Sequence, residues 1–150
     1  MSLAERLTAD LHQAMRAGDT LRVSTIRLAR AAVRNAEIER GHTLSDDEVI
    51  EVLTREMKRR REAIEAYTRA GRDDLARKES LELAILAEYV PPPLSAEELQ
   101  RIVAEAIERV GARDARDVGR VMAAVMPQVR GRADGAAVAE LVRQALGQPR

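Results

Sequence analysis

The stretch YVPPPLS, residues 89–95, divides the sequence into two parts. Its three consecutive prolines remove three backbone N–H donors and hold the chain in an extended path, so no helix can continue through them. One helix therefore has to end before Pro91, and the next can begin after Ser95. We predict an N-terminal domain over residues 1–90 and a C-terminal domain over residues 91–150.

Helix-start and helix-stop signals recur on both sides of this stretch. Three S-x-x-E motifs are present, in which the serine oxygen accepts a hydrogen bond from a backbone N–H and the glutamate reaches back to the cap. They pair Ser2 with Glu5, Ser45 with Glu48, and Ser95 with Glu98. Glycines follow the apolar segments, where a residue without a Cβ can close a helix in the left-handed conformation. These are Gly18, Gly41, Gly71, Gly111 and Gly147.

Apolar residues between these signals recur with the 3.6-residue period of an amphipathic helix. The first domain holds four such stripes, made by Leu3, Leu7, Leu11 and Met15; Val23, Ile26 and Val33; Val49, Leu53, Met57, Ile64 and Tyr67; and Leu75, Leu81, Ile85 and Tyr89. Three more follow, from Leu99 to Val110, Val118 to Met126 and Val138 to Leu146. The sequence predicts an all-α protein with roughly 70–75% helix, against about a third in globular proteins generally. Four helices form the N-terminal part, and a three-helix bundle follows.

The composition excludes several classes of protein. The 150 residues are 45% hydrophobic and 33% charged, which is typical of soluble globular proteins. Cysteine is absent, which excludes disulfides, thiolate nucleophiles and cysteine-ligated metals. The opening residues, MSLAERLTADLHQAM, contain no continuous apolar run like that of a secretory signal or membrane anchor. We therefore expect a cytoplasmic protein without a membrane association.

No self-sufficient active site is visible in the sequence. His12 and His42 are far apart, and the E-x-x-H spacing of Glu39 and His42 is interrupted by Gly41. Three serines are already assigned as helix caps, and none lies in a glycine-rich elbow or beside a plausible base. We predict no catalytic residue, no metal and no cofactor.

Two basic segments are candidate binding surfaces. The first is the run REMKRRREAIEAYTRAGR, residues 55–72, in which several arginines lie four residues after a glutamate. This spacing favours a solvated face with ion pairs over a phosphate-binding track. The pairs expected are Glu51 with Arg55, Glu56 with Arg60, and Glu65 with Arg69. Arg27, Arg30 and Arg34 have fewer acidic neighbours and share one face of the second helix. This second set is the better candidate for an acidic partner.

The stretch MPQVRGRADG, residues 126–135, allows two interpretations. In the first it is a turn: Met126 closes an apolar stripe, Pro127 stops a helix, Gly131 supplies a tight turn and Asp134 caps the last helix. In the second it binds an anion, because helix N-termini attract negative charge and five arginines lie in or just before it in a protein of zero net charge. They are Arg113, Arg116, Arg120, Arg130 and Arg132.

The sequence resembles the YqeY family of small bacterial proteins over nearly its full length. The resemblance is carried by MSLAERLTADLHQAM and STIRLARAAVRNAEIERG, by LTREMKRRREAIEAYTRAGR, by the linker EYVPPPLS, and by DVGRVMAAVMPQVRGRADG. The last stretch is similar to the family signature D-x-G-x-V-M-x-x-x-M-P-x-x-x-G-R-A-D-G. The signature positions are Gly119, Met126, Pro127, Gly131, Arg132, Asp134 and Gly135.

The resemblance implies a C-terminal part similar to the tail domain of GatB, a subunit of the glutamine-dependent amidotransferase that acts on mischarged tRNA. From it we expect a non-catalytic module that binds tRNA or another structured RNA through the five C-terminal arginines. Two alternatives remain open. One is a protein–protein adaptor that contacts an aminoacylation or amidotransferase component, and the other is a subunit of a carbon–nitrogen ligase with glutamine as amido-N donor.

Overall fold

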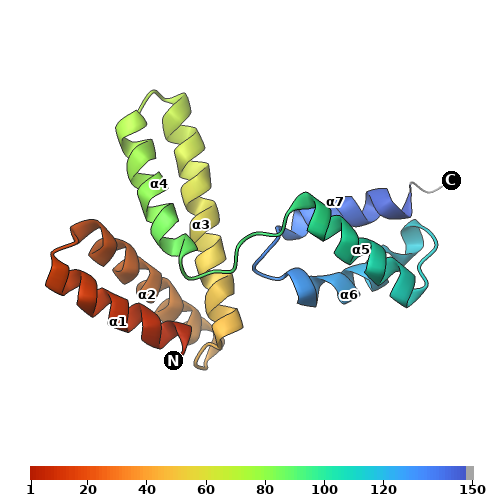
Figure 1. Cartoon of the computed structure of the whole chain (residues 1–150), viewed down its shortest axis with the longest axis horizontal. Coiled ribbons are helices and arrows are strands. Elements are labelled where there is room, and N and C mark those ends of the chain that lie inside the picture. The colour runs from red at the N-terminus through yellow and green to blue at the C-terminus, as the bar shows by residue number, and fades with distance from the viewer. Residues whose placement is uncertain (148–150) are drawn as a thin grey trace. The chain divides into compact units, whose positions relative to one another are not determined.

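A computed structural model describes residues 1–147, and the regular secondary structure of these residues consists of helices alone (Figure 1). They are α1 (Leu3–Ala17), α2 (Thr20–Arg40), α3 (Asp46–Arg69), α4 (Asp73–Ala87), α5 (Ala96–Val110), the short 3-10 helix η1 (Ala115–Asp117), α6 (Val118–Val129) and α7 (Gly135–Leu146). The predicted all-α fold, four helices followed by three, is confirmed. No helix in this part of the chain has the length and hydrophobicity needed to cross a membrane.

The chain divides into two compact units, Met1–Pro91 and Pro92–Arg150, and the predicted division falls between residues 90 and 91. Each unit has its own hydrophobic core. The buried side chains of the first include Leu7, Leu11, Ile26, Val49, Leu53 and Leu86, and those of the second are Val103, Ala106, Val121, Val125, Val129, Val138 and Val142. The two cores share no residue among those described.

The first unit consists of two helical hairpins, α1–α2 and α3–α4 (Figure 1). Helix α2 packs against α1 on one side and against both α3 and α4 on another. Complete capping boxes start α1 at Ser2 and α3 at Ser45, as predicted. At Ser95 the arrangement differs, because the Glu98 carboxylate accepts a hydrogen bond from the Ser95 hydroxyl.

The end of the first unit is fixed to α1 by Tyr89. Its ring is buried, its hydroxyl donates a hydrogen bond to the Asp10 carboxylate, and the Arg6 guanidinium lies 4.5 Å from the ring centre. Burial raises the pKa of Tyr89 above its ordinary value of 10.0, and the hydrogen bond to Asp10 adds to the rise. The hydroxyl is therefore held in its neutral, donating form.

The predicted apolar stripe of α4 is wrong at Leu81, whose side chain is 47% exposed. The next residue, Glu82, is buried instead, because its carboxylate lies 3.3 Å from Nε of Arg60 on α3. The predicted exposed face of α3 is correspondingly wrong at Arg60, which is only 7% exposed. Two of the expected pairs do form, Glu56 with Arg60 at 3.2 Å and Glu65 with Arg69 at 3.5 Å.

The second unit packs α5, α6 and α7 around a core made mostly of valine. The prediction that Pro127 stops a helix is wrong, because α6 continues through it to Val129. Proline in this position removes one hydrogen bond to the carbonyl of Ala123. The last turn nevertheless stays helical, and Val129 at its end is fully buried in the core.

Candidate functional site

Three of the five C-terminal arginines use their guanidinium groups within the second unit. Arg116 contacts Asp114 with Nη2 at 2.9 Å from Oδ2, which lowers the pKa of Asp114 to about 2. Arg120 donates to the carbonyl oxygen of Val110 and lies 3.8 Å from the Asp117 carboxylate. Arg132 donates from Nε to the carbonyl oxygen of Pro92 at 3.2 Å.

Of the other two arginines, Arg113 lies in the connection between α5 and η1, and Arg130 is the C-cap residue of α6. Arg113 donates its backbone N–H to Asp117 at 2.9 Å, and Arg130 donates its own to the carbonyl oxygen of Met126 at 3.0 Å. The structure therefore gives most of the five residues local contacts with carboxylates and backbone carbonyls. A shared binding surface is not evident from these contacts.

The signature turn, residues 126–135, joins α6 to α7 and holds the proline-rich linker. Gly131 has a φ of +79°, a conformation that favours glycine, as predicted for a tight turn. Asp134 is the N-cap residue of α7, but its side chain makes no capping hydrogen bond, which corrects the predicted role of its carboxylate. The Met126 Cε atom packs near Gly135, 3.9 Å from where a Cβ would stand.

The proline-rich linker and the signature stretch, which are far apart in the sequence, meet at this turn. Leu94 donates its backbone N–H to the carbonyl oxygen of Arg132 at 2.9 Å, and the Arg132 side chain returns a hydrogen bond to Pro92. Arg132 thus fixes residues 92–94 to the α6–α7 turn. The contacts of the signature turn are structural, and they leave the basic face of α2 as the surface with the stronger case for binding.

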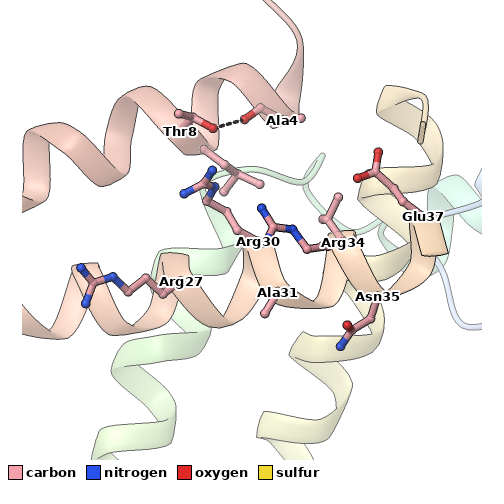
Figure 2. Close-up of a pocket in the computed structure, with 10 residues that line it drawn as sticks. Ala4, Thr8, Arg27, Arg30, Ala31, Arg34, Asn35 and Glu37 are labelled. Carbon is pink, nitrogen blue, oxygen red and sulfur yellow. Dashed lines mark hydrogen bonds between the residues drawn. The ribbon is translucent and has the colours of Figure 1, made fainter. Parts of the chain in front are cut away.

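A groove of about 330 Å³ lies between α1 and α2 and is lined by Arg27, Arg30 and Arg34 (Figure 2). The three arginines follow the i, i+3, i+7 spacing of one helical face. Figure 2 shows Arg30 and Arg34 extending from α2 toward α1, whereas Ala31 and Asn35 point to the opposite side of α2. The grouping predicted from the sequence is thus present in space and faces a hollow.

Small and apolar residues give the groove its shape. Ala4 and Thr8 line it from α1, and the Thr8 hydroxyl donates to the carbonyl oxygen of Ala4 at 3.1 Å. Leu7 and Val33 also line it, and both are buried in the core of the first unit. The groove therefore offers an apolar base with charged groups above it.

The charges in the groove are not balanced. Among residues 1–147, neither Arg30 nor Arg34 makes an ion pair or a side-chain hydrogen bond, and Arg27 has only a long contact of 4.0 Å with the Met15 sulfur. The one carboxylate of the lining, Glu37, accepts a hydrogen bond from the Leu44 backbone N–H at 3.1 Å. Three cations therefore face a single carboxylate that already has a partner.

This arrangement is suited to binding carboxylates. A guanidinium group presents a planar set of N–H donors that can hold a carboxylate with two parallel hydrogen bonds. The one hydroxyl in the lining, that of Thr8, donates to backbone. No group of three or more His, Asp or Glu side chains that could hold a metal occurs in the part of the chain that the structure describes.

The sequence indicated the shared face of the three arginines but not the groove. Helical spacing is local, so it places the arginines together without reference to the rest of the fold. The hollow depends on which residues of α1 lie opposite, and these are the small Ala4 and Thr8. The spacing of Ala4 and Thr8, four residues apart on the first helix, is only a weak indication in the sequence that small side chains share the helix face that lines the groove.

Comparison with known proteins identifies relatives along most of the chain. The family model described as Yqey-like protein matches residues 4–146. A protein of Pyrenophora tritici-repentis named "Altered inheritance of mitochondria protein 41, mitochondrial" is 30% identical over 95% of this chain and 80% of its own length. A protein of the same name from Eremothecium gossypii is 38% identical over 62% of this chain and 52% of its own length. Another from Clavispora lusitaniae is 32% identical over 76% of this chain and 68% of its own length.

These relatives contradict the expectation of a cytoplasmic tRNA-binding module. Their shared name places them in mitochondria, and it refers neither to RNA nor to amide transfer. The expectation of a cytoplasmic protein depended on the missing apolar run at residues 1–15. An absent apolar run does not bear on mitochondrial targeting, because mitochondrial targeting segments are amphipathic and need no such run.

Proposed function

This chain belongs to the YqeY family, and we propose that it is a protein-binding module whose first unit takes up an acidic segment of a partner protein in the α1–α2 groove. One observation supports the proposal above the others: Arg30 and Arg34 line an open groove without an ion pair among the described residues. The relatives' name refers to mitochondria and to their inheritance and states no reaction or partner. The molecular proposal therefore rests on the groove.

The geometry favours side-chain carboxylates of a protein. Glutamate carries a carboxylate on a short apolar stem, which matches arginines above the apolar side chains of Leu7 and Val33. The protein has zero net charge, so no overall field attracts polyanions, and attraction is confined to the groove. Hydrogen bonds to charged groups contribute about 1.5–3 kcal/mol when shielded and exposed ion pairs about 0.2–1 kcal/mol. Binding of moderate strength is expected.

The test is a titration of the full chain with a fluorescein-labelled deca-glutamate peptide, followed by anisotropy at low salt. The variant Arg30→Gln/Arg34→Gln should bind the peptide about tenfold more weakly. The two lost ion pairs together are expected to contribute about 1.4 kcal/mol, which corresponds to a factor of ten in Kd. The matched control is Arg101→Gln/Arg109→Gln, two exposed arginines of α5. Both double variants remove two positive charges. A difference in peptide binding between them therefore reports the groove and not the net charge.

Two outcomes would overturn the proposal. If both double variants weaken binding to the same extent, the peptide responds to total charge and not to the groove. If inorganic polyphosphate of the same charge competes as effectively as the peptide, the groove has no preference for a protein carboxylate. Mapping the peptide by amide chemical shifts should also place the largest changes on α1 and α2.

A further inference from the structure

We infer that the partner segment is an amphipathic helix that lies along the outer face of α2, with acidic side chains over the arginines and apolar side chains on an exposed apolar band. This inference rests on the proposed function and names the class of partner. This mainly apolar band consists of four exposed residues of α2, namely the apolar Leu28, Ala31 and Ile38 and the polar Asn35. Its two large hydrophobic members lie at its ends, Leu28 with 53% exposure and Ile38 with 73%.

Around the circumference of α2 the band adjoins the arginines, but its Ala31 and Asn35 side chains are turned away from α1 (Figure 2). At 3.6 residues per turn, its four side chains fall within about 80° of the helix circumference, and Arg27 and Arg34 follow on the adjoining edge. From Leu28 to Ile38 the band covers ten residues, which corresponds to about 15 Å along the helix axis. Large apolar side chains are thus exposed on α2 next to arginines that make no ion pair among residues 1–147.

A second groove adjoins the band on the side away from α1. It has a volume of about 460 Å³ and lies between α2 and α3, with Leu28, Ala32 and Ala36 among its lining residues. Ala31 and Asn35 line both this groove and the basic one. Figure 2 shows these two side chains on the face of α2 turned away from Arg30 and Arg34. The two hollows therefore share a low wall of small side chains, along which a helix could pack closely.

The two sides of this surface differ in charge. On the α3 side, Arg59 lies 3.4 Å from Glu56 and Arg40 lies 3.0 Å from Glu48, whereas Arg55, which also lines this groove, makes no ion pair among residues 1–147. Glu39 lines the same side and makes no ion pair among residues 1–147. The α1 side has the unpaired Arg30 and Arg34. The α1 side therefore has more arginines without an ion pair than the α3 side, and we expect the acidic edge of the helix to lie toward α1.

A helix fits this surface better than an extended segment. An extended peptide gains its affinity from the free backbone groups of a sheet edge, and the described part of the chain has no strand. Helix-in-groove recognition uses apolar anchors at i, i+3 or i+4, and i+7. A band of about 15 Å accommodates about three turns of such a helix.

The test compares two designed peptides of about 15 residues with identical composition, a length that covers the band with one turn to spare. In the first, leucines follow one helical face and glutamates one adjoining edge. In the second, the same residues are scrambled so that neither face exists. We expect the first peptide to bind the full chain about tenfold more tightly, since apolar anchors in grooves dominate such interfaces. Its circular dichroism should become more helical on binding.

Variants of the protein separate this inference from the proposed function. Leu28→Ser/Ile38→Ser should weaken the helical peptide about tenfold and leave deca-glutamate unaffected, because only the band is changed. Leu81→Ser, on the exposed face of α4, is the matched control. If the scrambled peptide binds as tightly as the helical one, or the band variant has no effect, the helical partner is refuted while acidic binding stands. If neither designed peptide binds and deca-glutamate does not bind either, both the helical partner and the proposed function are refuted.

Discussion

Arg60 is the residue whose environment departs most from its chemical preference. Its guanidinium is buried between α3 and α4, with Glu56 at 3.2 Å and Glu82 at 3.3 Å. Its Nε atom makes no hydrogen bond within the described structure, although the Glu82 carboxylate is close enough in distance. The attraction between these charges therefore has to offset the loss of hydration without ideal alignment.

Removing Glu82 should destabilise the first unit more than removing an exposed acid. Glu82→Gln leaves the buried Arg60 charge with one carboxylate, and we expect a loss of about 3 kcal/mol in the free energy of unfolding. Urea unfolding followed by tyrosine fluorescence measures this, because the sequence has no tryptophan and both tyrosines, Tyr67 and Tyr89, lie in the first unit.

The matched control is Glu65→Gln, whose ion pair with Arg69 is exposed. Its effect should stay below about 0.5 kcal/mol. The double variant Arg60→Met/Glu82→Leu should recover most of the loss, because a buried ion pair is often no more stable than apolar residues of similar volume. Equal effects of Glu82→Gln and Glu65→Gln would show that the buried position gives the pair no special importance.

Glu79 gives the same cluster a dependence on pH. Burial raises its pKa above the ordinary value of 4.5, and the negative charge of Glu82 raises it further. The folded protein thus holds the Glu79 proton more tightly than the unfolded chain does. Protonated Glu79 therefore contributes to the stability of the fold below pH 4.5, and this contribution is lost as the pH rises through the pKa of the folded state. Glu79→Gln should be more stable than the parent by up to about 0.5 kcal/mol at pH 7. The gain should vanish near pH 4, and a gain of equal size at both values in urea titrations would contradict the assignment.

At the scale of elements, the α6–α7 connection shows how two glycines of one motif have opposite roles. Gly131 stands in the turn with a φ of +79°, where a side chain is strained. Gly119 lies in the first turn of α6 with ordinary helical backbone, and a Cβ there would meet nothing within 4 Å. The same residue type is therefore needed at one position and costs stability at the other.

Alanine substitutions should separate these roles. Gly131→Ala is expected to destabilise the second unit by about 1–2 kcal/mol, the cost of a left-handed residue with a Cβ. Gly119→Ala should stabilise it by about 0.5–1 kcal/mol, because alanine loses less backbone entropy in a helix. Hydrogen exchange at the amides of Val121 and Val125 reports the stability of this unit, and changes of the same sign in both variants would refute the distinction.

Element boundaries could be predicted from the sequence because their signals are local. Ser2, Ser45 and Gly111 cap helices through contacts with the nearest turn, and the structure places them there. The inward face of α4 could not be predicted, since Glu82 turns inward only because Arg60 lies opposite on α3. The groove is of the same kind: the α2 arginines were visible as a face, but the hollow exists through the small residues of α1.

At the scale of the whole molecule, stability is divided between two cores of different character. The first is built from leucine, isoleucine, methionine and tyrosine as well as valine, whereas the second contains only valine and alanine among its fully buried residues. Units of about 60 residues bury only about 60% of their unfolded surface and are marginal on their own. The second unit should therefore be the more sensitive of the two to loss of a single methyl-bearing side chain.

Core truncations in each unit test whether the two cores act separately. Val125→Ala removes two methyl groups from a fully buried position and should cost the second unit about 2 kcal/mol. We expect faster hydrogen exchange throughout α5–α7, with no shift in the urea midpoint reported by the tyrosines of the first unit. Leu53→Ala, also fully buried, should do the reverse and lower the tyrosine midpoint by an amount equivalent to about 3–5 kcal/mol. If Val125→Ala lowers the tyrosine midpoint as far as Leu53→Ala does, the chain unfolds as one cooperative body, and the separation of the cores has no thermodynamic counterpart.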